Sequence, residues 1–254
     1  MGKKKNKIND FTDFGYQKVK WKEKKGRVYS VFDSVHQKYD LMNDLMSFGL
    51  HRVWKKVALR HTALRSGNIA LDVAAGSCDL AISLSKQVGS KGKIFATDIN
   101  ANMLEIGRDK AIDSSAFKNI SFVQADAENL PFSSFAFDCI TIGFGLRNVT
   151  DKPLALSSMF NALKPGGRLL ILEFSKANLG LLEKLYDFYS FNILPKIGEF
   201  VLSDKSSYEY LVESIRRHPN QDDLKKMMEQ NGFENCKYYN LSSGIVSLHI
   251  GFRI

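Results

Sequence analysis

Apolar runs of strand length alternate with amphipathic stretches through the middle of the chain, most clearly between residues 68 and 98. Residues 68–74 form a short apolar run, typical of a strand buried on both faces, which breaks at Ala75-Gly76-Ser77-Cys78. The next residues have helical spacing, and we expect Asp79 to accept hydrogen bonds from the first free amides of that helix. A second apolar run ends in Asp98. This order predicts a right-handed βαβ unit with a ligand at the carboxyl ends of its strands.

The same alternation continues to the end of the chain. It predicts helices at 100–110, 153–163 and 222–230, and strands at 120–125, 137–144, 168–174, 233–241 and 245–252. The last two strands alternate like a hairpin. The pattern as a whole predicts a doubly wound α/β domain.

Two helical segments precede the first strand, with a corner between them at 45–49. Helices in this place would cap the strand ends, which makes Tyr39 a candidate for a substrate pocket. Neighbouring polar candidates are Asp40, Asn43 and His51. The alternative is that Tyr39 belongs to the core and the polar residues are helix caps.

The chain therefore divides into a basic tail at 1–10, an N-terminal helical cap at 11–65, and a core at 66–254 with a helical insertion at about 179–218. Inside the insertion, residues 181–194 predict a helix with aromatic side chains on more than one face. Such a helix needs burial or an apolar ligand, so it either packs on the fifth strand or forms a lid.

Composition bounds the size of the core and shows that the chain is basic. At 254 residues, 44% of them hydrophobic, the chain is long enough to bury a full core. Much of the net charge of +9 comes from lysines between Lys3 and Lys25. We interpret residues 1–10 as a solvated tail, with weak attraction to acidic lipid or RNA as the alternative. No segment has the pattern of a secretory signal or the length of a membrane span.

The cysteines and histidines indicate the cellular compartment and whether the protein binds a metal. Three cysteines without a C-x-x-C pair indicate a reducing compartment, so we expect a cytoplasmic protein. The five histidines are dispersed and show no ligand spacing, so we predict no metal.

The turn after the first strand distinguishes two classes of ligand. A dinucleotide site places Gly-x-Gly-x-x-Gly there, whereas this chain has Ala74, Gly76 and Asp79. Carboxylates at Asp79 and Asp72 would repel a pyrophosphate, but they suit S-adenosylmethionine, which carries an ammonium group and a sulfonium. Asp98 suits either ligand, because a carboxylate in this place accepts hydrogen bonds from both ribose hydroxyls. A nicotinamide-dependent oxidoreductase therefore stays open as an alternative, as does a basic RNA-binding module.

Several segments together resemble a known family. Leu71-Asp72, Asp98, Asp126-Ala127 and Leu163-Lys164-Pro165-Gly166-Gly167 resemble class I S-adenosylmethionine-dependent methyltransferases. More narrowly, Phe144-Gly145-Leu146-Arg147-Asn148 and Tyr208-Glu209-Tyr210-Leu211-Val212-Glu213-Ser214-Ile215 are similar to blocks of the UbiE/MenG family of ubiquinone and menaquinone C-methyltransferases. The likeness extends from Phe14 to Arg253. It implies a seven-stranded sheet of order 3-2-1-4-5-7-6 in which strand 7 is antiparallel.

The resemblance also implies the cofactor positions. These are Asp72, Gly76, Ser77, Asp98, Asp126, Ala127 and, through its backbone, Gly143. The turn departs from the family pattern, because Ala75, Ser77 and Cys78 stand where the family has Gly, Thr and Gly. We expect the added side chains to tighten the turn and to weaken binding of S-adenosylmethionine.

The implied reaction is methylation of a ring carbon of a prenylated quinol. A deprotonated ring hydroxyl would drive the attack, so a cation at Arg147 can stabilise the phenolate and Asn148 can hydrogen-bond the ring oxygens. Three routes for the proton stay open, namely Arg147 acting through a water, Tyr39, and His218. The alternative for Arg147 is a structural ion pair with an acid such as Asp151.

The same resemblance implies partners. We expect transient contact with an anionic membrane surface at the inner face of the cytoplasmic membrane, because the tail of a prenylated quinol stays in the bilayer. A complex with other quinone-biosynthesis enzymes and a homo-oligomer are left open, and we expect no nucleic acid partner.

Overall fold

The computed structural model describes residues 11–36, 39–176 and 205–254; the side chains of Tyr39 and Lys205 are outside this description. Within it, one sheet has seven strands: β3 (Ile69–Val73), β4 (Lys93–Asp98), β5 (Ile120–Gln124), β6 (Phe137–Gly143), β7 (Leu163–Phe174), β8 (Glu234–Leu241) and β9 (Val246–Phe252). Their spatial order is β5-β4-β3-β6-β7-β9-β8, and β9 is antiparallel to both neighbours. Counted within the core, this is the order 3-2-1-4-5-7-6 with strand 7 antiparallel. The expected fold is confirmed.

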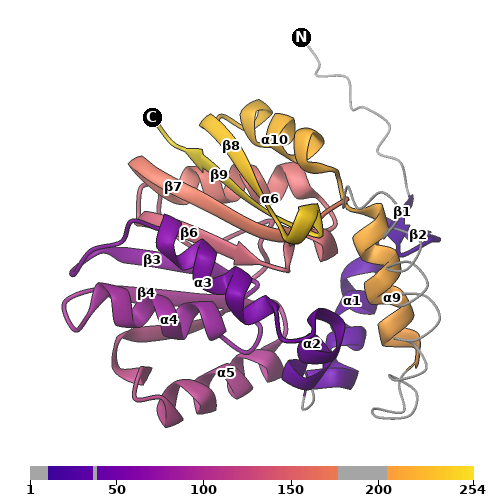
Figure 1. The fold of residues 1–254 in the computed structure, drawn as a ribbon, viewed down its shortest axis with the longest axis horizontal. Helices are drawn as coiled ribbons and strands as arrows, with labels where there is room; N and C mark the ends of the chain where they lie inside the picture. The colour runs from indigo at the N-terminus through magenta and orange to yellow at the C-terminus, as the bar shows by residue number, and fades with distance from the viewer. Residues whose placement is uncertain (1–10, 37–38, 177–204) are drawn as a thin grey trace.

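Helices cover both faces of this sheet (Figure 1). One face packs against α3 (His51–His61), α4 (Asp79–Val88) and α5 (Ala101–Asp113), and the other against α6 (Lys152–Ala162) and α10 (Gln221–Gln230). Alternate residues of β3 supply the two cores, since Ala70 packs with the first group and Leu71 with the second. The prediction that the apolar run at 68–74 contains a strand buried on both faces is therefore confirmed.

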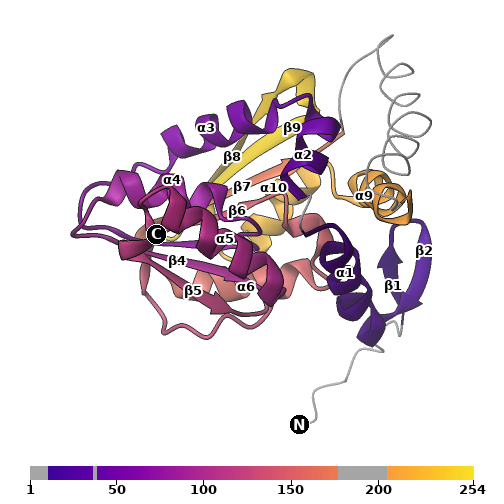
Figure 2. The ribbon, with the colours of Figure 1, turned by 90° about the horizontal axis from the view of Figure 1, so that it is seen from below.

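A cap stands at one end of the sheet, where Figure 2 shows it to one side of the core. It contains α1 (Trp21–Val35), α2 (Tyr39–Ser47) and α9 (Lys205–Arg217), together with a hairpin of β1 (Phe11–Phe14) and β2 (Gln17–Lys20). The expectation of a purely helical cap from residue 11 is therefore corrected at its beginning. The turn residue Gly15 has φ +58°, and the Glu213 side chain of α9 occupies the place of a Cβ there. The amide of Tyr16 donates to Glu213 Oε2 at 2.9 Å, which ties the hairpin to α9.

Some element boundaries differ from the predicted ones. The turn expected at 164–167 lies inside β7, where the register with β6 jumps from Leu163 to Arg168. Asn100 caps α5 as expected, accepting from the amides of Asn102 and Met103. The predicted helix at 181–194 lies outside the described residues. In the described part of the chain, no helix is long and apolar enough to cross a membrane.

Candidate active site

A cavity opens at the carboxyl ends of β3, β4, β5 and β6, with α1 on its far side. We call it the main cavity. It brings together five residues predicted to bind cofactor or substrate, namely Gly76, Asp98, Asp126, Ala127 and Asn148. The parallel register explains this meeting, because Val73 pairs with both Thr97 and Ile142 and the strands therefore end at one edge.

The backbone is strained where β3 and β6 end. Ala74 and Phe144 have φ of +50° and +58°, a region that L residues rarely adopt. A Cβ on Gly145 would lie 2.5 Å from the Cβ of Ala74, so only glycine fits opposite that residue. Positive φ at two adjacent strand ends is typical of a functional site, because the surrounding fold must hold such conformations in place.

Asp98 is held with its carboxylate toward the turn that follows β3. Its Oδ2 accepts from the amide of Gly76 at 2.9 Å, and its Oδ1 accepts from the amide of Asn100 at 2.9 Å. Burial raises the pKa of Asp98, and these backbone hydrogen bonds oppose that rise. The backbone of Ile99 also bonds this carboxylate, which keeps lone-pair capacity for a ligand hydroxyl.

Asp126 lines the main cavity from the loop after β5, the strand next to the one that ends in Asp98. Lys25 of α1 forms ion pairs with Asp126 and with Glu128, the latter at 2.8 Å. Glu128 in turn accepts from the amides of Thr150 and Asp151 at 3.2 and 3.1 Å. Lys25 therefore fastens α1 across the loop that follows β5.

A smaller cavity adjoins the main one, and both are lined by Ala74 and Phe144. It is lined by the remaining predicted cofactor residues, Asp72, Ser77 and Gly143. Lys55 and Asp79 complete its polar part. All seven predicted cofactor positions thus line one of two adjoining cavities.

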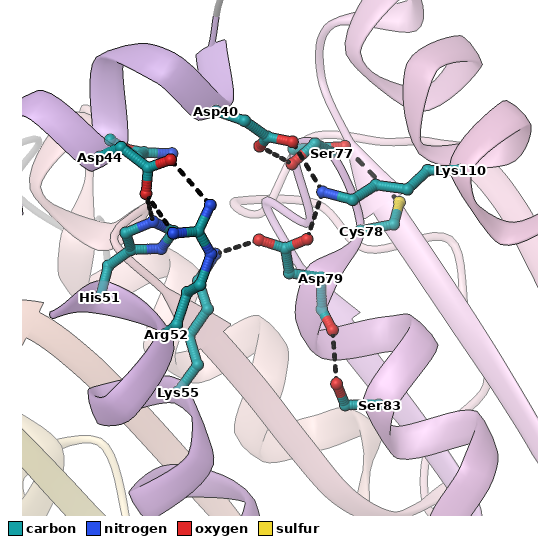
Figure 3. Close-up of polar contacts among 12 residues, drawn as sticks. Asp40, Asp44, His51, Arg52, Lys55, Ser77, Cys78, Asp79, Ser83 and Lys110 are labelled. Carbon is teal, nitrogen blue, oxygen red and sulfur yellow. Dashed lines mark hydrogen bonds and ion pairs between the residues drawn. The ribbon is translucent and has the colours of Figure 1, made fainter. Parts of the chain in front are cut away.

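A network of charged side chains surrounds the turn at Ser77 (Figure 3). Lys110 of α5 pairs with Asp40 of α2 and with Asp79, and Lys55 of α3 pairs with Asp79 at 2.7 Å. Ser77 Oγ donates to Asp40 Oδ1 at 2.9 Å. Burial acts to raise the pKa of Asp79, but Lys55 and Lys110 hold it lower, at about 2.

This network corrects two expectations about Asp79. Its carboxylate pairs with lysines and does not cap α4, whose N-cap residue is Cys78 without a side-chain bond. The amide of Ala81 in the first turn is satisfied by Asp72 Oδ2 at 3.0 Å. Because two lysines offset its charge, Asp79 alone is no argument against a pyrophosphate.

Asp72 is buried beneath the turn. Its Oδ1 accepts from Thr141 Oγ1 at 2.7 Å, and its Oδ2 accepts from Ala81. Burial raises the pKa of Asp72 to about 7. Both oxygens are engaged within the protein, so Asp72 supports the turn more directly than it can contact a ligand.

Of the departures from the family turn, Ala75 and Ser77 line the smaller cavity, whereas Cys78 is accommodated away from both cavities. Cys78 has φ +62° and is fully buried, and its Sγ occupies the place of a Cβ on Gly107 of α5. A Cβ on Gly143 would lie 2.7 Å from Leu80 Cδ1, so that leucine fills the position of the missing side chain. The added Cys78 side chain points at α5, and a tighter turn with weaker cofactor binding stays a prediction.

Arg147 is buried in an ion pair. Its Nη1 lies 2.8 Å from Glu173 Oε1, and its backbone amide donates to Glu173 Oε2 at 3.1 Å. Glu173 is fully buried. Asp151, the acid suggested for a structural pair, instead caps α6 by accepting from Leu154. A structural role for Arg147 is therefore present, with Glu173 as the partner.

The other residues considered for catalysis are placed differently. Asn148 lines the main cavity, and Tyr210 Oη donates to its Oδ1 at 3.0 Å, which leaves the amide N–H groups for a ligand. His51 is buried against Asp44 at 2.9 Å and lines neither cavity, which favours the structural alternative for it. Burial lowers the pKa of His218 well below its usual value. The side chain of Tyr39 lies outside the described residues.

Sequence reasoning missed Lys25, Lys55 and Lys110. Lys25 belongs to the basic run near the N-terminus, and nothing in the local pattern distinguishes it from its neighbours. Among the described residues, no group of three or more His, Cys, Asp or Glu is placed to hold a metal. The absence of a metal stays a prediction.

Comparison with known proteins adds independent information. A model of the ubiE/COQ5 methyltransferase family matches residues 18–253. Two similar proteins are the ubiquinone/menaquinone biosynthesis C-methyltransferases UbiE of Francisella philomiragia and Haemophilus ducreyi. Each is 54% identical over 248 residues, which cover 98% of this chain and 99% and 96% of theirs.

A solved structure supports the fold. The chain is similar to a SAM-dependent methyltransferase from Thermotoga maritima, with a TM-score of 0.61 and 19% identity over 89% of this chain and 100% of that one. The two chains share the arrangement of strands and helices.

Proposed function

Because this chain belongs to the ubiE/COQ5 methyltransferase family, we propose that it methylates a ring carbon of a prenylated quinol with S-adenosylmethionine, in ubiquinone or menaquinone biosynthesis. Membership of this family excludes the two alternative functions, a nicotinamide-dependent oxidoreductase and a basic RNA-binding module. The observation that supports the proposal best is the pair of adjoining cavities at the carboxyl edge of the sheet, with the Asp98 carboxylate at the end of β4.

The residues of the two cavities fit S-adenosylmethionine. When bound, it supplies a methyl group activated by a sulfonium. Asp98 would hold the ribose hydroxyls, and the apolar side chains of Val28, Phe32 and Met103 would contact the adenine. In the smaller cavity, Lys55 would attract the carboxylate of the methionine end and Asp79 its ammonium group.

Asn148 and Arg147 stay our candidates for substrate recognition. The amide N–H groups of Asn148 can donate to a ring oxygen, and Tyr210 fixes the orientation of that amide. Arg147 already neutralises Glu173, so its role toward the ring depends on its Nε and not on an unpaired charge.

A prenylated substrate requires access to a membrane, and the corner between α2 and α3 suits such a surface. Its exposed apolar side chains are Leu41, Phe48, Leu50 and Val53. Lys56 and Arg60 are exposed further along α3 and match an anionic headgroup layer. The lysines at 3–7 and the helix expected at 181–194 lie outside the described residues.

Methyl transfer from radiolabelled S-adenosylmethionine to demethylmenaquinol and to a 2-polyprenyl-6-methoxy-1,4-benzoquinol tests the proposal. Label should appear in the ring of at least one of them. Quinones extracted from cells lacking the protein should contain the demethyl precursor. If neither quinol is labelled although S-adenosylmethionine binds, the substrate class is wrong.

A further inference from the structure

A third cavity, of about 190 Å³, lies beside the main one. It is enclosed by the β1–β2 hairpin, the beginning of α1, the segment from Arg147 to Lys152, and α9. Thr150 lines both this cavity and the main cavity, so the two are neighbours across one residue. We call it the cationic cavity, because Lys24, Arg147, Lys152 and Arg217 all line it.

The acids near these cations already have partners. Glu173 pairs with Arg147, and Asp13, the one acid that lines the cavity among the described residues, pairs with the exposed Lys18 at 2.7 Å. Glu128 pairs with Lys25. Among the described residues, no acid lies within ion-pair distance of three of the cations, Lys24, Lys152 and Arg217. The cavity thus carries an excess of positive charge.

Two lysines converge on a single acceptor. Lys24 is only 4% exposed, and its Nζ donates to the carbonyl oxygen of Val149 at 3.4 Å. Lys152 Nζ donates to the same oxygen at 3.1 Å. One neutral carbonyl cannot offset two ammonium groups, so an additional anion would stabilise this arrangement.

Two buried donors also lack acceptors. Arg147 Nε and Thr150 Oγ1 have no hydrogen-bond partner among the described residues. Arg147 is 5% exposed and Thr150 8% exposed. Buried N–H and O–H groups normally have partners, so these two indicate a ligand with acceptor oxygens.

The position of Lys152 in this cavity also changes its protonation. Burial and, to a smaller extent, the charge of Lys24 lower the pKa of Lys152 to about 8, although Glu173, Asp13 and Glu128 oppose the change. Arg147 and Arg217 add positive charge from the other walls, and the neighbouring His218 is neutral. A free amine is therefore available at Lys152 in mildly alkaline solution.

We propose that the cationic cavity holds one ring oxygen of the quinol as a phenolate and that Lys152 is the base that forms it. The O–H bond of the quinol breaks, its electron pair stays on oxygen, and the proton forms an N–H bond on the free amine of Lys152. Arg147 Nε and Thr150 Oγ1 then donate to the phenolate oxygen. This inference rests on the proposed function, because it assigns a subsite to that substrate.

A free oxyanion such as phosphate has the same chemistry, so the test must separate the two sources. The probe is 4-nitrophenol, whose deprotonated form is yellow. Titration with the protein near the probe's own pKa should increase the yellow absorbance, because the cavity binds the phenolate in preference. Lys152→Met and Lys24→Met should each abolish most of this increase. Lys226→Met, at an exposed lysine on α10, is the control and should leave it unchanged.

Folding and cofactor binding are measured on the same variants. Both cavity variants should keep the wild-type affinity for S-adenosylmethionine and should melt no lower than the wild type, because each removes one of two neighbouring cations. Lys152→Met should also reduce kcat/KM for the quinol about 100-fold or more and remove the rise in rate between pH 7 and pH 9. Lys152→Arg restores charge but not the free amine, so it should not restore the rate.

The outcomes are distinct. If phosphate raises the melting temperature of the wild type but not of Lys152→Met, while 4-nitrophenol shows no difference between them, the cavity binds a free anion and the quinol assignment is wrong. An unchanged pH profile in Lys152→Met removes its role as base. If nitrophenolate binds as expected but no quinol is methylated, the subsite stands and the proposed substrate fails.

Discussion

Arg147 and Glu173 form an ion pair with almost no exposure to solvent, and its removal should affect folding before it affects chemistry. Arg147→Ala leaves the buried carboxylate without its partner, so the free energy of unfolding should fall by about 3–5 kcal/mol. Denaturant titration measures this loss. Arg65→Ala, an exposed residue, is the control and should change stability by less than about 0.5 kcal/mol.

A double variant separates folding from chemistry at the same pair. Arg147→Met with Glu173→Leu removes both charges and should recover much of the lost stability. If Arg147 also contacts substrate, the recovered protein should still bind S-adenosylmethionine and turn over at least about 100-fold more slowly. A stable double variant with normal turnover would leave Arg147 with a structural role alone.

Asp98 should carry a large share of the affinity for S-adenosylmethionine. Two charge-assisted hydrogen bonds to ribose hydroxyls predict a loss of about 2–4 kcal/mol in Asp98→Ala, allowing for partial replacement by water. Calorimetry measures this affinity. Asp126→Ala, in the loop after the neighbouring strand, gives a comparison. Asp126 is already paired with Lys25, so its loss should reduce the affinity for S-adenosylmethionine less. Equal affinity in Asp98→Ala and the wild type would contradict the site assignment.

Lys152 should also make stability depend on pH. Its folded pKa of about 8 lies below the ordinary 10.5, so folding requires loss of a proton in the interval between them. The unfolded state binds more protons there, and stability should therefore increase as pH rises from about 8 toward 10.5. Lys152→Met should flatten this increase in melting curves recorded across that range. A wild-type profile in the variant would show that the amine is not buried as described.

Residues at strand ends were predictable, and residues that meet them from the cap were not. Asp98 and Asp126 each follow an apolar strand, and parallel strands bring their carboxyl ends together whatever the helices do. Lys25 meets Asp126 across 101 residues of sequence, and Lys110 meets Asp40 across 70. Neither contact leaves a periodic signal. The same reason explains why Arg147 was paired in the prediction with the adjacent Asp151 and not with Glu173 on β7.

At the scale of elements, the packing of α5 against the turn before α4 depends on a missing side chain. Cys78 Sγ occupies the space beside Gly107, so Gly107→Ala should overpack this contact and cost about 1–3 kcal/mol. Cys78→Gly in the same chain removes the collision. Denaturant titration of the two single variants and the double variant gives the coupling between them. Additive effects, with no coupling, would mean that the sulfur and the added methyl do not meet.

Strands and long helices of the core were predictable because their apolar period is continuous. The boundaries moved where tertiary contacts compete with the local pattern, as at β7, which begins at Leu163 before the expected turn. The β1–β2 hairpin was not predicted, since its four-residue strands carry little pattern and its turn depends on Glu213. The structure of such cap elements depends on contacts with residues that are distant in the sequence.

At the scale of the whole molecule, the membrane contact should depend on the corner between α2 and α3. Phe48 is 74% exposed, so Phe48→Ser removes apolar surface without disturbing the core. Flotation with anionic vesicles at low salt should recover a smaller fraction of this variant than of the wild type, and high salt should reduce binding of both. The control is Phe135→Ser, an equally aromatic exposed residue on another part of the surface. Equal flotation of all three would place the contact elsewhere.

The tie between the hairpin and α9 also sets an order of events during synthesis. Tyr16 and Glu213 are 197 residues apart, so the hairpin can pack on α1 early but cannot form this tie until α9 has left the ribosome. The sheet edge that carries Asp98 and Asp126 is complete much earlier. The nascent chain therefore builds the floor of the main cavity first, and it can close the cationic cavity between the hairpin and α9 only near the end of translation.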